Sequence, residues 1–122
     1  MKQWLLITGT LSTLLLSACS QVSSSNNTQV YISDGYVQCE AKAQSIAITQ
    51  SQLEQAGVKV LKSECAQISE QATIAMCGAG GPGIHVLTVN RYDVTKAEQL
   101  GFAEVTELDQ QGLQFNRISC EE

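Results

Sequence analysis

The sequence has little positive charge, little histidine and few aromatic side chains. Its 122 residues hold seven Lys and Arg against twelve Asp and Glu, which gives a formal net charge of −5, and aromatic residues make up 5%. Binding to nucleic acid needs a clustered basic surface that neutralises phosphates, so this composition excludes it as a partner. The length fits one small domain.

Closely spaced metal or redox ligands are also missing. The four cysteines after residue 25 are 26, 12 and 43 positions apart, and no Cys-x-x-Cys pair occurs. These spacings argue against a structural zinc site, including one completed by His85, and against a redox-active dithiol. We therefore expect neither a metal nor another cofactor.

His85 is the only histidine, so a Ser-His-Asp or Cys-His site would have to use it. It lies in an alternating run in which Ile84 and Val86 face one side of a strand and His85 faces the other. We expect His85 to face solvent. No paired carboxylates occur at a recognisable spacing, and the protein is predicted not to be an enzyme. A small enzyme that uses His85 or a thiol is the alternative.

The first eighteen residues have the pattern of a secretory signal peptide. Lys2 precedes an apolar run, and the small residues Ser17 and Ala18 precede Cys19. Polar residues interrupt the run, which is too short to cross a bilayer, since that needs about 20 apolar residues. The segment is therefore predicted to be a cleaved signal and not a transmembrane anchor.

The segment Leu16-Ser17-Ala18-Cys19 resembles the lipobox of bacterial lipoproteins. The resemblance implies cleavage before Cys19 and acylation of its thiol and its amino group. Ser20, which is not Asp, implies sorting to the outer membrane. The protein would then be bound to the membrane through its lipid anchor. An ordinary cleavable signal beside an unrelated cysteine is the alternative.

Residues 20–29 hold a single apolar side chain, Val22. Such a segment buries too little surface to fold, so residues 19–29 are predicted to be the lipidated cysteine and a flexible tether. The domain over 30–122 would face the periplasm and contact an envelope protein whose identity the sequence does not give.

Short β-branched runs alternate with helical stretches after residue 30. Strands are predicted over 36–39, 58–61, 72–77 and 84–90, near 102–106, and over 113–118. Two short helices, near 49–56 and 93–100, end at Gly57 and Gly101. Their similar endings suggest two β-α-β halves. The predicted class is α+β, with a small, mostly antiparallel sheet and both helices on one face.

The domain contains Cys39, Cys65, Cys77 and Cys120. Export places them in an oxidising compartment, where an even number of cysteines in a small domain predicts two disulfides. Four cysteines allow three pairings. If the first two strands are adjacent and parallel, Cys39 and Cys65 lie at the same edge of the sheet. This placement favours Cys39–Cys65 together with Cys77–Cys120.

A glycine-rich segment lies between the strands predicted at 72–77 and 84–90. Phosphate-binding loops are followed by a helix N-terminus and carry a lysine, whereas a strand follows here and no lysine is present. We therefore expect a hairpin loop that contacts a partner. Its residues are Gly78, Gly80, Gly81, Pro82 and Gly83.

Residues 58–65, Val-Lys-Val-Leu-Lys-Ser-Glu-Cys, resemble the strand and cysteine of the outer-membrane sensor lipoprotein of the Rcs envelope-stress system. That protein is also a two-disulfide domain on a tether, and the resemblance implies a role as a stress sensor. Other short segments, including Gln38-Cys39-Glu40 and Cys77-Gly78, resemble small exported proteins, which implies no particular activity. The sequence predicts a lipid-anchored periplasmic binding or structural module, with the stress sensor and the small enzyme as alternatives.

Overall fold

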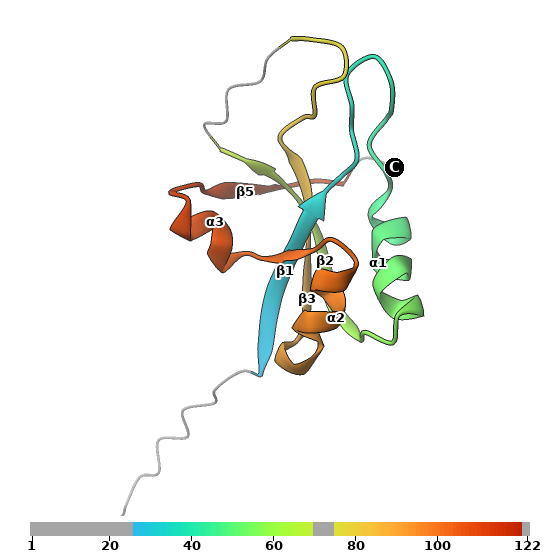
Figure 1. The fold of residues 1–122 in the computed structure, drawn as a ribbon, viewed down its shortest axis with the longest axis vertical. Coiled ribbons are helices and arrows are strands. Elements are labelled where there is room, and N and C mark those ends of the chain that lie inside the picture. The colour runs from blue at the N-terminus through green and yellow to red at the C-terminus, as the bar shows by residue number, and fades with distance from the viewer. Residues whose placement is uncertain (1–25, 70–74, 121–122) are drawn as a thin grey trace, which may run out of the picture.

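The computed structural model describes residues 26–69 and 75–120 (Figure 1). Five strands alternate with three helices and one 3-10 turn. In chain order these are β1 (Asn27–Ser33), α1 (Ile46–Gln55), β2 (Val60–Ile68), β3 (Gly83–Asn90), the 3-10 turn η1 (Arg91–Asp93), α2 (Val94–Gln99), β4 (Ala103–Glu104), α3 (Thr106–Gln110) and β5 (Phe115–Ile118).

The strands form one antiparallel sheet in the order β4-β1-β3-β2-β5. Since β1 and β2 both run antiparallel to β3, which lies between them, β1-α1-β2 is a β-α-β unit split by a strand. The unit β3-α2-β4 is split by β1 in the same way. These six elements have the ferredoxin-like arrangement, and β5 extends the sheet beyond β2. The predicted α+β class and antiparallel sheet are confirmed.

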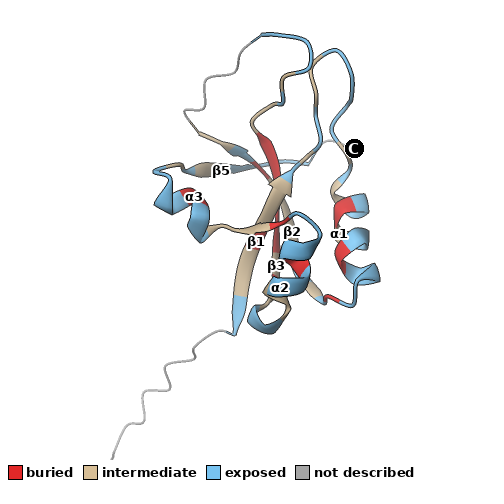
Figure 2. Ribbon diagram, in the orientation of Figure 1, coloured by how far each residue is buried: buried red, intermediate tan, exposed pale blue. Residues whose placement is uncertain are grey.

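The central strand β3 is covered on both faces. On one face, Leu87 and Val89 pack with Leu53 of α1 and Ala97 of α2. On the opposite face, Ile84 and Val86 belong to a second cluster that includes Leu108 of α3. We call these the α1/α2 face and the α3 face. The buried residues follow β3 and the sheet-facing sides of the helices (Figure 2).

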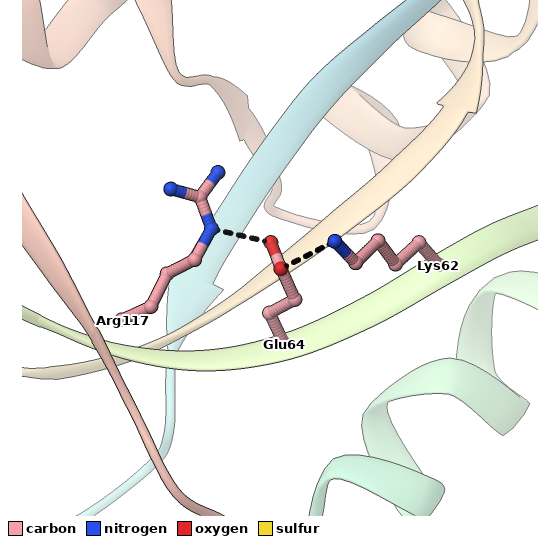
Figure 3. A network of polar contacts seen from close by, with 3 residues as sticks. All are labelled: Lys62, Glu64 and Arg117. Carbon is pink, nitrogen blue, oxygen red and sulfur yellow. Dashed lines mark hydrogen bonds and ion pairs between the residues drawn. The ribbon is translucent and has the colours of Figure 1, made fainter.

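The strand β5 is held to β2 by an ionic contact as well as by backbone pairing. Glu64 accepts a hydrogen bond from Nε of Arg117 at 2.8 Å and lies 2.8 Å from Nζ of Lys62 (Figure 3). The bonds from Lys62 and then Arg117 lower the pKa of Glu64 below its ordinary value. The carboxylate therefore stays ionised and joins the two strands.

Three predicted boundaries differ from the structure. Residues 36–39 form a turn with isolated bridges at Val37 instead of a strand, because Cys39 has a φ of 67° that interrupts an extended run. Of the strand predicted at 72–77, residues 72–74 lie outside the described ranges and Cys77 lies in a turn. The strand β1 begins at Asn27, inside the predicted tether 19–29, because its whole length pairs with β3.

Two disulfides are present, but their predicted pairing is wrong. The bonds are Cys39–Cys77 and Cys65–Cys120, with Cα–Cα distances of 5.1 and 5.2 Å. The prediction assumed that a strand at 36–39 lies beside the strand at 58–61 and parallel to it, whereas residues 36–39 belong to no strand of the sheet and the neighbours of β2 are β3 and β5. Cys65 instead pairs in register with Ile118 of β5, which brings Cys120 within reach.

Within residues 26–69 and 75–120, no helix is long and apolar enough to cross a membrane. The predicted signal peptide, Cys19 and most of the predicted tether lie outside these ranges.

Candidate functional site

A pocket of about 300 Å³ opens beside the first turn of α1, where β3 begins. This volume is at the lower end of the range for small-molecule sites. Its walls come from the segment between β1 and α1, from the first residue of α1, from β2, from the loop before β3 and the start of β3, and from the end of β5. The lining residues that define its chemistry are Asp34, Tyr36, Gln44, Ile46, Pro82, Ile84, His85 and Ile118.

His85 forms part of the pocket wall and is only 3% exposed, so the prediction that it faces solvent is wrong. Its register partners are Ile32 of β1 and Cys65 of β2, and all three lie on the α1/α2 face. The alternation around His85 is typical of a half-exposed strand. Because β3 is central and helices cover both of its faces, neither set of alternating side chains reaches bulk solvent.

A chain of hydrogen bonds fixes the imidazole of His85. Gln44 Nε2 donates to Thr49 Oγ1 at 3.1 Å, and Thr49 Oγ1 lies 2.7 Å from His85 Nδ1. With the Gln44 amide in this orientation, the Thr49 hydroxyl accepts from Gln44 and donates its one hydrogen to Nδ1. Nδ1 is then the unprotonated nitrogen, and Nε2 carries the hydrogen of the neutral ring.

The other nitrogen of His85 has no hydrogen-bond partner among the described residues. Nε2 makes no hydrogen bond to the described residues, and no fully buried side-chain nitrogen or oxygen among those residues lacks a partner. Nε2 is therefore not fully buried, and the pocket is the space that His85 lines. The ring presents one fixed hydrogen-bond donor to whatever occupies this space.

Asp34 supplies the negative charge of the pocket. Its Oδ1 accepts the backbone N–H of Tyr36 at 2.9 Å, and its carboxylate lies so close to Gly83 that a Cβ there would stand 2.8 Å from Cγ. Burial lowers the pKa of His85, and the charge of Asp34 opposes this shift without cancelling it. Because its pKa lies below the ordinary value, His85 is neutral at pH 7.

Part of the glycine-rich loop predicted to contact a partner forms a wall of the pocket. Gly81, Pro82 and Gly83 line it, whereas Gly78 and Gly80 do not. A Cβ on Gly81 would stand 2.9 Å from Cδ1 of Tyr36, so the loop backbone lies directly against that ring. Gly81 allows the close approach of Tyr36, and Gly83 allows that of Asp34. A strand follows this loop, whereas a helix follows a phosphate-binding loop.

The first turn of α1 also borders the pocket through Ile46. Ser45 stands at the N-cap position, but its side chain makes no capping hydrogen bond. The first N–H groups of any helix lack partners within the helix, and they carry the positive end of its dipole.

Several other chemistries lack their residues in the described part of the chain. Thr49 is 1% exposed and cannot approach a substrate as a nucleophile. All four cysteines after residue 25 are paired. No group of three or more His, Cys, Asp or Glu in residues 26–69 and 75–120 could hold a metal ion. Asp34, Gln44 and Thr49 become neighbours of His85 only through packing between distant parts of the sequence. No local motif marks them, so the sequence alone does not reveal this group.

Comparisons with protein-family models, with curated proteins and with solved structures find no match to this chain. A function must therefore be inferred from the His85 pocket and from the signal-like and cysteine patterns of the sequence.

Proposed function

We propose that the protein is a lipid-anchored, non-catalytic binding module of the bacterial cell envelope. In this proposal Cys19 carries the lipid, the domain faces the periplasm from the outer membrane, and the His85 pocket is the binding site. The lipobox-like segment supports the anchor, and two disulfides in a small domain fit an oxidising compartment.

The observation that carries the binding role is the fixed imidazole of His85. Its Nδ1 is bonded to Thr49, so its Nε2–H has one direction and one protonation state, next to the carboxylate of Asp34. Pockets with apolar walls and a few convergent polar groups are the usual form of small-molecule sites.

The stress-sensor alternative depends on residues 58–65, of which only Cys65 lines the pocket. The small-enzyme alternative needs a nucleophile or a second acid–base group at the pocket. The hydroxyl bonded to His85 is that of Thr49, which is buried behind the ring, and no hydrogen bond among the described residues joins His85 to Tyr36 or Ser119, the other hydroxyl groups of the wall. No nucleophile is therefore held against the imidazole, and the arrangement favours binding over catalysis.

The test uses the full chain, expressed in a bacterium and purified in detergent, together with the small-molecule fraction released from the periplasm by osmotic shock. A ligand at a hundred times its Kd stabilises a protein by about 2.7 kcal/mol, which raises the Tm of a small domain by several degrees. We expect the fraction to raise the Tm of the wild-type protein.

Ala43→Trp places a large side chain in the pocket wall and should abolish the rise. Ala41→Trp is the matched control, because Ala41 is also exposed, lies in the same segment and does not line the pocket. An equal rise in Ala43→Trp, or no rise in the wild type, would overturn the proposal.

A further inference from the structure

We propose that the His85 pocket binds the zwitterionic head group of a free α-amino acid. The ammonium group would lie against Asp34, and the carboxylate would accept from Nε2–H of His85 beside the start of α1. This inference rests on the proposed binding function and names the ligand class for that same site.

The proposed position of the ammonium group follows from the carboxylate of Asp34, which has no cationic partner among the described residues. Asp34 lines the pocket, and no Lys or Arg is among the lining residues. The ion pairs within residues 26–69 and 75–120 involve Glu64 and Asp93, not Asp34. A carboxylate in a confined site is stabilised by a cationic partner. A ligand that brings an ammonium group supplies the partner that the described residues do not.

The carboxylate half follows from His85 and α1 together. His85 is only 3% exposed, and the described residues provide no acceptor for its Nε2–H. Ile46, the first residue of α1, lines the same pocket as His85, so the positive end of a helix without a side-chain cap borders this space. A donor and a helix N-terminus that border one space favour an anionic acceptor.

The proposed ammonium position at Asp34 and the proposed carboxylate position at His85 lie in one small pocket. This favours a single zwitterionic ligand over two separate ions. The charge of Asp34 is near enough to act on His85, and both line a pocket of about 300 Å³. In an α-amino acid the ammonium and carboxylate groups share one carbon atom. The remaining wall includes the apolar side chains of Ile46, Pro82 and Ile118, which suit a small apolar side chain of the ligand.

The experiment uses three molecules built on one skeleton: L-alanine, propionate, which lacks the ammonium group, and ethylamine, which lacks the carboxylate. Because His85 is the only histidine, its imidazole C–H signals in an NMR spectrum of the full chain in detergent report the pocket without ambiguity. We expect L-alanine to shift these signals saturably and both partial ligands to bind at least about tenfold more weakly.

Asp34→Asn keeps the oxygen that accepts from Tyr36 but removes the charge. It should reduce the affinity for L-alanine to about that for propionate. Asp93→Asn is the matched control, because Asp93 pairs with Lys96 away from the pocket, and it should bind L-alanine as the wild type does.

Equal binding of L-alanine and propionate would show a site for anions alone, and equal binding of ethylamine would show a site for cations alone. Either result overturns the inference. No response to L-alanine, combined with a Tm rise in the periplasmic fraction that Ala43→Trp abolishes, would reject the amino-acid class and leave the binding function standing. No Tm rise would reject the binding function itself.

Discussion

The hydroxyl oxygen of Thr49 and Nδ1 of His85 lie 2.7 Å apart, and this contact joins helix α1 to the central strand of the sheet. Both residues are almost completely buried, at 1% and 3% exposure. A buried polar pair of this kind is satisfied only when both partners are present. The position of α1 and the orientation of the imidazole therefore depend on each other.

Thr49→Val tests this dependence, because valine keeps the shape of threonine and removes the hydroxyl. Nδ1 of His85 would then be buried without a partner, and we expect a loss of about 1–3 kcal/mol in the free energy of unfolding. Urea unfolding measures it. Thr88→Val, on the opposite face of β3, is the control and should change stability by much less. An equal loss of unfolding free energy in the two variants would mean that the Thr49–His85 hydrogen bond does not contribute more to stability than an ordinary threonine hydroxyl.

The stability of the domain should decrease as the pH falls below about 6.5. Burial lowers the pKa of His85 in the folded protein, so the unfolded chain takes up a proton first. The stability is therefore complete above the unfolded pKa and is lost as the pH falls toward the folded one, at up to about 1.4 kcal/mol per pH unit. Urea unfolding at pH 7.5, 6.5 and 5.5 measures the slope.

His85→Gln should remove that slope, since no other histidine is present. A wild-type protein equally stable at pH 7.5 and pH 5.5 would show that the His85 pKa is not lowered by folding.

Local periodicity in the sequence predicts the α+β class, the antiparallel sheet and the edge strand β5. It also predicts the helices α1 and α2 with the glycines that follow them. The pocket cannot be predicted in the same way. Sequence places His85 on the surface because the pattern of one strand does not tell whether that strand is central or at an edge. Strand order, which local patterns do not encode, decides both the burial of His85 and the pairing of the cysteines.

Strand order also explains why the sequence does not reveal where β1 begins. Asn27, Thr28 and Gln29 are polar and resemble the tether before them, yet each pairs with a residue of β3. Backbone pairing along a buried neighbour extends the strand to residues whose own composition gives only a weak strand signal.

The observed cysteine pairing can be checked by peptide mapping without reduction. Trypsin alone leaves Cys65 and Cys77 in one peptide, because no Lys or Arg lies between them. Additional cleavage at Glu70 by a glutamate-specific protease separates them. Mass spectrometry should then find Cys39 joined to Cys77 and Cys65 joined to Cys120. Peptides that join Cys39 to Cys65 would contradict the pairing that the structure shows.

Cys19→Ser tests the anchor. The thiol is the atom that would carry the lipid, so we expect this variant to incorporate no radiolabelled palmitate and to leave the membrane fraction. Ser20→Asp is the informative companion, because the lipoprotein resemblance implies that it stays acylated but moves to the inner membrane. Palmitate in Cys19→Ser would contradict the lipoprotein interpretation.

The two disulfides should contribute to stability by similar amounts but affect the pocket differently. They join residues 38 and 55 positions apart, and in the chain-entropy model loops of this size give about 4 kcal/mol each. A small domain has about 5 kcal/mol at the low end, so reduction of both bonds should leave it largely unfolded. Circular dichroism and thermal melting with and without a strong reductant measure this effect.

The paired variants separate the two bonds. Cys65 lines the pocket and Cys120 follows Ser119 of its wall, whereas Cys39 and Cys77 are not among the lining residues. Replacing Cys65 and Cys120 with Ala should therefore lower the Tm and also weaken the response of the His85 NMR signals to L-alanine. Replacing Cys39 and Cys77 with Ala should lower the Tm by a similar amount and leave that response closer to wild type. An unchanged Tm under reduction would mean that the thiols are not paired in the purified protein.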